Sequence, residues 1–336
     1  MKIQFFTKGT AIMLLAATLL SGCTKEDESD CVGNMNLTFR FTRNGQDNFG
    51  PQVPSLSVFV FDEAGIFLGR WDEWDNGKFS TDYIMSLPLP PGKYSFVAWG
   101  GLKTPDYYLC SPGQAQNNAT NPVIGITHID DMLLRLSGNH SNEVIFIPAT
   151  QFHGEALLQD VVAGKANDIT INLIKNSKEI RVTVNGLSAS SERMALRDED
   201  DLFSLVSMRL SAPNGGYNFH NIMEQNATVM TYSEQNRHIG TGNSLVSSFH
   251  TLQLKLKDRN LNNIPYGFTI WDGQFGSALH TADMLHDYIN QVSAYDTQAE
   301  IDSEDLFDII INLGANVGVS VTVNGWNVDT SDNTLR

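Results

Sequence analysis

The amino-acid sequence predicts an all-β protein with two tandem β-sandwich domains and a few short helices. Most of the 336-residue chain alternates apolar and polar residues with period two, in short runs rich in Val, Ile, Phe, Tyr and Thr. Closely spaced clusters of Gly, Pro, Asn and Asp separate these runs, which is typical of sandwiches. Several runs recur in the same order in the second half of the chain, so we expect the second sandwich to repeat the first.

The first 22 residues (1–22) are predicted to be a signal peptide. Lys2 and Lys8 form a basic start, an apolar run follows from 11 to 20, and small residues come next. So short an apolar run cannot span a bilayer as a helix. The ending Leu-Ser-Gly-Cys resembles a bacterial lipobox, whose cysteine is acylated and becomes the first mature residue. We therefore expect lipidation of Cys23, with two or three acyl chains such as palmitate.

Residues 23–31 are expected to form a disordered tether, because TKEDESD is acidic and lacks apolar residues. The segment also resembles the acidic export tags of surface lipoproteins in Bacteroidetes, which implies an outer membrane lipoprotein exposed on the cell surface. The formal net charge is −16, and it becomes −18 once Lys2 and Lys8 leave with the signal peptide. So acidic a chain has no electrostatic footprint for nucleic acid.

The mature chain keeps Cys31 and Cys110 besides Cys23, so one disulfide can form in an oxidising compartment. The sequence supplies no geometry, and each cysteine can equally be a lone thiol. No enzyme signature occurs, because the chain contains no H-E-x-x-H, G-x-S-x-G, Walker loop or paired C-x-x-C motif. We therefore predict no catalytic residue, no metal site and no cofactor.

Recurring strands define the expected domains, an N-terminal one over 32–177 and a C-terminal one over 178–336. YSFVAWGG in the first half returns as YGFTIWDG in the second, and DITINL returns as DIIINL. Trp99 and Trp271 occupy equivalent places in the first pair of strands. Because a large aromatic side chain buries much apolar area, we expect these two residues to anchor the two cores.

The stretch VTVNG occurs at 182–186 and again at 321–325. The first copy follows DITINL and is expected to open the second domain, as NLTFRFTRNG opens the first. The second copy follows DIIINL and opens no further domain in this chain. We interpret it as a strand that either closes the sheet of its own domain or is donated to a neighbouring molecule.

Several motifs stand out in combination. They are the lipobox cysteine with a second cysteine soon after it, VFVFDEAGIF, LPLPPGKYSFVAWGG, FHG at 152–154, INLIKNSKEIRVTVNGL and the terminal VTVNGW. Together they resemble the FimB/Mfa-type fimbrial subunits of Bacteroidetes, lipoproteins at anchor or accessory positions of pili. The resemblance implies two transthyretin-like (Greek-key) β-sandwich domains, incorporation into a surface fimbrium, cell adhesion and no catalysis.

Subunits of this pilus class join by strand exchange, so the resemblance implies other fimbrial subunits as partners. Val319, Val321 and Val323 alternate as a donor strand requires, and Trp326 offers a large anchor after an Asn-Gly turn. We therefore expect residues 319–326 to act as a donor strand. A strand that closes the sheet of its own domain is the equal alternative.

In polymerising members of the class, an arginine-specific protease removes the first strand. Arg43 lies just after the predicted first strand, and cleavage there would remove NLTFRFTR. Because a folded strand resists proteases, we expect no cleavage at this site. That favours a lipid-anchored subunit over a stalk subunit.

We expect the chain to attach or terminate a fimbrium at the outer membrane, with a host receptor or glycan as a further partner. The alternative is a surface glycan-binding lipoprotein of a nutrient-uptake system. In that interpretation Trp71, Trp74, Tyr107 and Tyr108 form a platform that stacks on sugars. Packing of these four side chains within strands and loops is the competing explanation.

Overall fold

A computed structural model describes residues 32–75, 79–112, 119–139, 141–187, 203–224, 229–256, 265–274, 276–314 and 318–328. Strands dominate these residues, which confirms the predicted all-β class. The expected signal peptide and tether lie outside the described residues. No helix within the described ranges is long and apolar enough to cross a membrane. The short helices include α2 (Phe49–Gln52), η2 (Ile129–Asp131), η4 (Met284–Tyr288), η5 (Ile289–Gln291), η6 (Ser293–Tyr295) and α5 (Gln298–Ser303).

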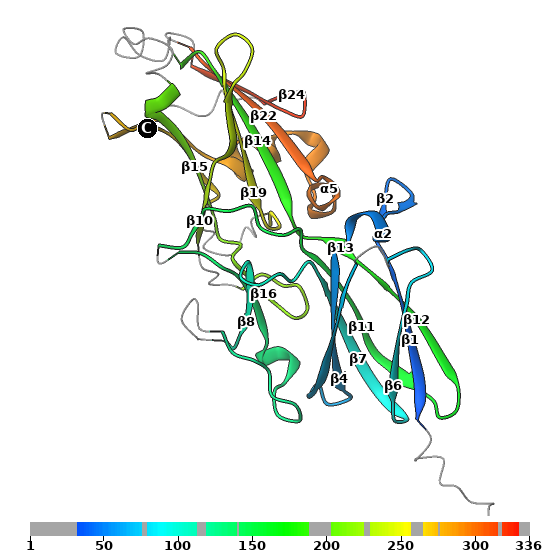
Figure 1. Ribbon diagram of the computed structural model, residues 1–336. Helices are drawn as coiled ribbons and strands as arrows, with labels where there is room; N and C mark the ends of the chain where they lie inside the picture. The colour runs from blue at the N-terminus through cyan, green and yellow to red at the C-terminus, as the bar shows by residue number, and fades with distance from the viewer. Residues whose placement is uncertain are drawn as a thin grey trace, which may run out of the picture.

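The first sandwich packs a three-stranded sheet on a five-stranded sheet (Figure 1). The three-stranded sheet has the order β12-β1-β6, and its strands are β1 (Gly33–Arg40), β6 (Ile84–Leu89) and β12 (Ala166–Asn172). The five-stranded sheet has the order β13-β11-β7-β4-β5, and its strands are β4 (Ser55–Asp62), β5 (Phe67–Trp74), β7 (Gly92–Gly100), β11 (Phe152–Val161) and β13 (Ile174–Lys175). A small hairpin of β2 (Thr42–Arg43) and β3 (Gln46–Asp47) follows β1.

The second sandwich packs a six-stranded sheet on a five-stranded sheet. The six-stranded sheet has the order β18-β19-β14-β22-β23-β24, with strands β14 (Lys178–Asn185), β18 (Gln235–Ile239), β19 (Leu245–Thr251), β22 (Leu306–Leu313), β23 (Val319–Val323) and β24 (Trp326–Val328). The five-stranded sheet has the order β10-β17-β15-β20-β21, with strands β10 (Glu143–Val144), β15 (Val206–Ala212), β17 (Met230–Ser233), β20 (Gly267–Asp272) and β21 (Ser277–Asp283).

The two sandwiches share one strand order. In the first, β1 lies between a parallel β12 and an antiparallel β6, and in the second β14 lies between a parallel β22 and an antiparallel β19. The order β5-β4-β7-β11 corresponds in the same way to β17-β15-β20-β21. The recurring text lies on corresponding strands, YSFVAWGG with YGFTIWDG on β7 and β20, and DITINL with DIIINL on β12 and β22. The repeated sequence therefore marks a repeated fold.

The strand register identifies the counterpart of each VTVNG copy. Asn36 of β1 lies opposite Asp168 of β12, and Arg181 of β14 lies opposite Asp308 of β22. This register matches NLTF of β1 with RVTV of β14, so the first copy corresponds to the opening strand of the first sandwich. The second copy, on β23, extends the second sandwich beyond β22. Among the described residues, no strand occupies the equivalent place beside β12.

A third sheet joins the two halves of the chain. Its strands β8 (Tyr107–Cys110) and β9 (Leu133–Leu136) precede β11, whereas β16 (Gly216–Asn218) follows β15. The central strand β9 pairs with both of the others, and β10 likewise pairs with β17. The segment between β7 and β11 therefore contacts the second sandwich, although it falls within the expected domain 32–177.

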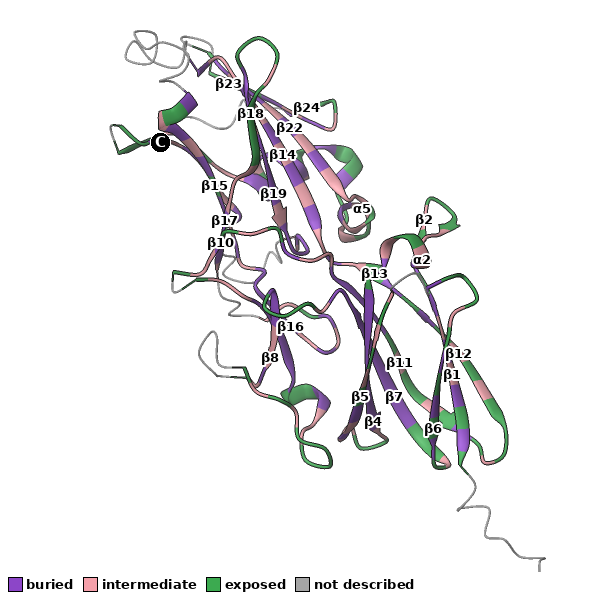
Figure 2. Cartoon of the chain, in the orientation of Figure 1, coloured by how far each residue is buried: buried purple, intermediate pink, exposed green. Residues whose placement is uncertain are grey.

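Strands β4 and β7 are buried on both faces (Figure 2). Val58, Val60 and Phe96 point into the core between the two sheets of the first sandwich. Phe59 and Trp99 point the other way and join the core of the second sandwich, where Phe219 packs edge-on against both. The third sheet and its neighbouring loops cover the outer face of the five-stranded sheet of the first sandwich, which would otherwise meet water. This covered face forms one continuous apolar contact between the two sandwiches.

A buried amide network ties the connection between β13 and β14 to the second sandwich. The Asn176 side chain donates to Gln151 at 2.9 Å and to Asn221 at 2.7 Å, and it accepts from Asn221 at 3.1 Å. All three side chains are buried. Hydrogen-bonded buried amides favour the geometry that satisfies them, so this network holds one arrangement of the connection.

Replacing Asn176 by Ala (N176A) should lower the free energy of unfolding by about 2 kcal/mol, because it leaves buried amide groups of Gln151 and Asn221 without partners. Urea unfolding followed by fluorescence measures the change. Asn172, an exposed asparagine on β12, supplies the control, and N172A should change the free energy by less than about 0.5 kcal/mol. Equal effects of the two substitutions would contradict a structural role for the network.

Candidate functional site

The sequence-predicted donor segment, residues 319–326, forms most of the C-terminal hairpin β23–β24. Strand β23 pairs antiparallel with β22, from Ile309 opposite Val323 to Leu313 opposite Val319. On its other side β23 pairs with β24, the outermost strand of the sheet. The hairpin is therefore a part of the second sandwich in this chain, which is the alternative that the sequence left open.

Alternation along β23 sends its valines into the core. Val321 and Val323 are fully buried in the core of the second sandwich, and Val319 packs against it. Ser320 is exposed and Thr322 is half-buried on the opposite face. Trp326 behaves differently, because 56% of its surface is exposed at the edge strand. The valines thus stabilise this chain, and Trp326 is available to a partner.

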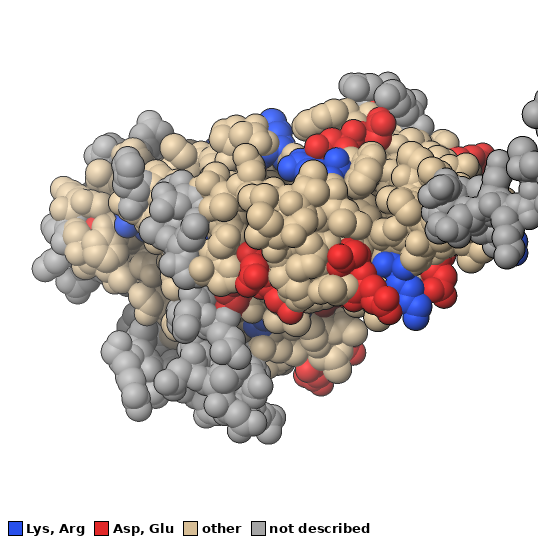
Figure 3. All heavy atoms as spheres, turned by 90° about the horizontal axis from the view of Figure 1, so that it is seen from below, with Lys and Arg blue, Asp and Glu red and all other residues tan. Residues whose placement is uncertain are grey.

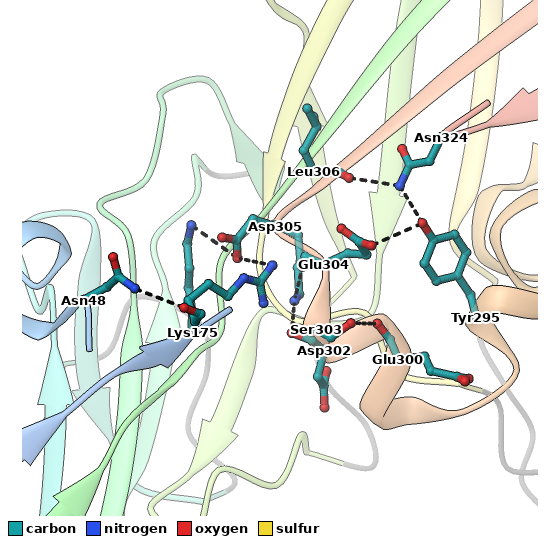
Figure 4. A network of polar contacts seen from close by, with 12 residues as sticks. Asn48, Lys175, Tyr295, Glu300, Asp302, Ser303, Glu304, Asp305, Leu306 and Asn324 are labelled. Carbon is teal, nitrogen blue, oxygen red and sulfur yellow. Dashed lines mark hydrogen bonds and ion pairs between the residues drawn. The ribbon is translucent and has the colours of Figure 1, made fainter. Parts of the chain in front are cut away.

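The turn of the hairpin is anchored by Asn324. Asn324 and Gly325 have φ values of +49° and +82°, as a two-residue Asn-Gly turn between antiparallel strands requires. The Asn324 amide donates to the Tyr295 hydroxyl at 2.6 Å and to the Leu306 carbonyl at 3.3 Å (Figure 4). Its oxygen accepts from the backbone N–H of Asp308 at 2.6 Å. These bonds fasten the turn to Tyr295 of η6 and to the first residues of β22.

Donation of β23 to a neighbour would require this hairpin to leave β22 and expose Val321 and Val323. The structure brings the four predicted donor residues together on one hairpin, and their role in partner binding stays a prediction. The outer edge of β24 offers a second way to bind a strand, because among the described strands β24 has a neighbour on only one side. An edge strand can pair with an added strand through its unpaired backbone groups.

A cluster of charged residues lies between the two sandwiches beside α5 (Figure 4). The Asp305 carboxylate forms ion pairs with the Arg43 guanidinium of β2 at 3.4 Å and with the Lys175 ammonium of β13 at 3.5 Å. The buried Lys178 ammonium donates to the carbonyl of Asp302 at 2.8 Å and to the carbonyl of Glu304. Arg43 and Lys175 of the first sandwich are thereby held to the second sandwich.

Burial lowers the pKa of the Lys178 ammonium to about 8 from its ordinary 10.5, and the carboxylates of Asp302 and Asp305 offset part of that shift. Between those two pH values the unfolded chain binds more protons at this site than the folded chain does. Stability therefore rises with pH through this window, by at most roughly 1.4 kcal/mol for each pH unit.

Comparing unfolding free energies of the wild type and of Lys178→Met (K178M) from pH 7 to pH 10 isolates this contribution from other titrating groups. As the pH rises above 8, the free energy of unfolding of the wild type should increase relative to that of K178M. Lys175→Met (K175M), which removes a neighbouring charge at the same junction, should keep the rise of stability with pH, because burial is the largest cause of the lowered Lys178 pKa. Parallel curves for the wild type and K178M would show that the buried ammonium keeps its ordinary pKa.

A family model for the fimbrillin-A associated anchor proteins Mfa1 and Mfa2 matches residues 27–332. The chain belongs to this family. The major fimbrium anchoring subunit FimB of Porphyromonas gingivalis is 26% identical over 183 residues, which are 53% of this chain and 55% of that protein. The alignment therefore spans about half the length of the curated relatives it matches.

Solved structures share the fold of this Mfa2-family chain. The fimbrial anchor protein Mfa2 from Porphyromonas gingivalis superposes with a TM-score of 0.69 at 18% identity, covering 89% of this chain and 99% of that chain. A Bacteroides thetaiotaomicron protein, for which polysaccharide binding has been suggested, superposes with a TM-score of 0.72 at 20% identity, covering 91% and 100%. At these identities the likeness shows the fold alone.

In the Mfa2-family chain, the predicted protease site is engaged in the fold. Arg43 lies on β2, its side chain is 21% exposed and bound to Asp305, and Asn48 donates to its carbonyl at 3.4 Å. Cleavage after Arg43 would remove β1, the middle strand of its sheet. Both features accord with the expectation of no cleavage, which stays a prediction.

Of the three cysteines, the structure describes Cys110. Cys23 and Cys31 lie outside the described residues, so lipidation of Cys23 stays a prediction, and a disulfide between Cys31 and Cys110 stays one of the two alternatives. Cys110 ends β8 as a buried free thiol. Burial raises its pKa to about 11, which keeps the thiol protonated and unreactive at neutral pH.

The four aromatic residues proposed as a sugar platform do not lie on one surface. Tyr107 is buried and donates its hydroxyl to the Ala149 carbonyl at 2.6 Å, and Tyr108 is its neighbour on β8. Trp71 and Trp74 lie on β5 in a different sheet. An open cleft of about 740 Å³ beside β5 is lined by Trp71 and by none of the other three. The geometry therefore does not favour the glycan-binding alternative.

Reasoning from sequence did not find the charged junction around Lys178 and Asp305. A signal was present, because Lys178 opens a strand whose other inward positions are all apolar. A lysine at the first position of such a pattern is easily assigned to the preceding turn. Its burial depends on α5, which is distant in sequence.

Proposed function

We propose that this chain is a lipid-anchored fimbrial subunit that attaches or terminates a fimbrium at the outer membrane. In this proposal, acylated Cys23 holds the chain in the membrane, and the C-terminal hairpin binds a neighbouring subunit by strand pairing. The family match over residues 27–332 carries the proposal. Its chemistry is binding, since the family and its structural relatives are fimbrial and adhesin-type proteins.

The arrangement of the molecule supports this role. The chain enters β1 at one end of the elongated molecule, and the hairpin β23–β24 lies toward the other end (Figure 1). A lipid at Cys23 would therefore hold the first sandwich near the membrane and present the second sandwich away from it. A subunit that connects a membrane to a filament needs its two attachments separated in this way.

The lipid anchor is tested by mass spectrometry of the amino-terminal peptide from intact cells. We expect a peptide that begins at acylated Cys23 and a protein that fractionates with the outer membrane. The variant Cys23→Ala (C23A) should leave that fraction. A mature chain that begins at Asn44 would contradict the anchor role, because cleavage would have removed the lipid together with β1.

Trp326→Ala (W326A) should weaken binding of the neighbouring subunit by at least about 2 kcal/mol, roughly a 30-fold loss of affinity, if Trp326 is the anchor of a strand-pairing interface. Because Trp326 is exposed, the stability of the isolated chain should hardly change. Trp74, which is 52% exposed on the first sandwich, provides the matched control W74A. Co-purification of fimbrial subunits with each variant measures the effect, and equal retention by both would contradict binding through the hairpin.

A further inference from the structure

The loop between β8 and β9 displays three apolar side chains to solvent. Val123 is 52% exposed, Ile124 is 65% exposed and Ile126 is 72% exposed. We call residues 121–127 the apolar loop. Single exposed apolar residues are ordinary in proteins. Three branched apolar residues on one turn instead form an apolar surface of the kind that contacts a protein or a membrane.

The apolar loop is held in one conformation by β5. Gly125 donates its N–H to the Phe67 carbonyl at 2.8 Å, and Phe67 donates to the Thr127 carbonyl at 2.8 Å. Within the loop, Ile126 and Thr127 donate to the Val123 carbonyl, and Val123 donates to the Thr127 hydroxyl at 2.8 Å. The backbone donors at 123, 125, 126 and 127 are therefore satisfied inside the protein.

The apolar loop lies at the same end of the molecule as the start of β1 (Figure 1). The strand register shows which other residues lie at this end. Gly33 at the start of β1 lies opposite Leu89, and Asp62 at the end of β4 lies opposite Tyr94. His128, which directly follows the apolar loop, forms a β-bridge with Ile66 in the turn after β4, so the loop lies beside this turn. Seen from below, this face shows mostly uncharged residues, with groups of Asp and Glu and a few Lys and Arg among them (Figure 3).

We propose that the apolar loop is a second, non-covalent membrane contact, in which Val123, Ile124 and Ile126 enter the boundary between lipid headgroups and acyl chains. The inference rests on the proposed lipidation of Cys23. From Cys23 to Cys31 the chain has only nine residues, which span at most about 30 Å when fully extended. A lipid at Cys23 therefore keeps this end of the first sandwich close to the membrane surface.

Two physical features suit the apolar loop to a membrane. Backbone groups placed in a water-poor region must be hydrogen-bonded within the protein, and the loop's donors at the four positions above already are. The chain is strongly acidic, so attraction to anionic headgroups cannot supply the contact, and burial of the apolar tip must do so. One covalent attachment leaves the subunit free to tilt, whereas a second contact fixes its orientation.

The test uses the acylated full-length mature chain, purified from cells and reconstituted in phosphatidylcholine vesicles. An environment-sensitive fluorophore is attached at Ile126→Cys (I126C) in a Cys31→Ser background, since Cys110 is buried. The matched control is Ile239→Cys (I239C), because Ile239 is 50% exposed on β18 of the second sandwich. We expect a blue-shifted emission and quenching by spin-labelled lipid at position 126, and an aqueous emission without quenching at position 239.

A further variant, Ile124→Asp with the label at position 126, should still float with the vesicles but lose the blue shift and the quenching. If labels at 126 and 239 both report water while the chain floats, the membrane contact is overturned and lipidation stands. A label at 126 that is shielded equally without vesicles would also overturn it, in favour of a protein contact. A chain that carries no acyl group and does not float contradicts the proposed function itself.

Discussion

Removing residues 318–336 should abolish stable folding of the second sandwich in the isolated chain. The deletion takes away β23 and β24, and with them the buried side chains of Val321, Val323 and Val328. Each buried valine contributes about 1.5–3 kcal/mol, so the loss is at least about 4.5 kcal/mol. Domains are stable by only about 5–15 kcal/mol, and the deletion also leaves β22 as an uncovered edge. Circular dichroism and urea unfolding of the truncated chain measure the effect.

A milder pair of substitutions keeps this prediction open to refutation if the truncated chain cannot be purified. Val323→Ala (V323A) should cost about 2–3 kcal/mol, because it removes two buried methyl groups and leaves a cavity. Ser320→Ala (S320A), on the exposed face of the same strand, should change stability by less than about 0.5 kcal/mol. If V323A leaves the isolated chain as stable as the wild type and weakens only partner binding, β23 acts as a donor strand instead.

Replacing Trp99 by Ala (W99A) should lower the free energy of unfolding by about 3–5 kcal/mol. The Trp99 side chain is fully buried on β7, with its ring 4.5 Å from His153 and 6.0 Å from Phe219, measured between ring centroids. It therefore connects the five-stranded sheet of the first sandwich to a loop of the second. Its loss should weaken the coupling of the sandwiches as well as the stability of each.

Differential scanning calorimetry distinguishes these two effects. We expect W99A to melt at a lower temperature and in a broader or divided transition, since the two sandwiches no longer unfold together. The corresponding residue of the repeat, Trp271 on β20, is only half-buried, and W271A should cost roughly 1–2 kcal/mol. Equal losses for W99A and W271A would contradict the role of Trp99 as the link between the sandwiches.

The contrast between these two tryptophans shows where sequence reasoning stopped. Trp99 and Trp271 occupy matching places in repeated text, and both were expected to anchor cores. The structure buries Trp99 completely because the segment between β7 and β11 and the loop at Phe219 cover the outer face of its sheet. Trp271 is only partly buried. A repeat in sequence predicts equivalent strands, but burial depends on what packs against them.

The C-terminal hairpin shows the same limit at the candidate site. Alternating valines before an Asn-Gly turn describe a strand with one apolar face, and that description fits a donor strand and a closing strand equally. The pairing of β23 with β22 and the bonds of Asn324 to Tyr295 and Leu306 place the strand in its own sheet. These partners lie in other elements, so no pattern local to 319–326 could identify them.

The sequence by itself determined the all-β class, the duplicated order of strands and the family, because period-two patterning, turn residues and repeated motifs are local or statistical properties of the chain. Only the tertiary structure decided which strands are buried on both faces and that Lys178 is held between Asp302 and Glu304 near Asp305. It also decided that the apolar loop lies at the end of the molecule where β1 begins. These features arise from contacts between segments far apart in sequence. Their energies depend on geometry that the order of residues does not display until the chain is folded.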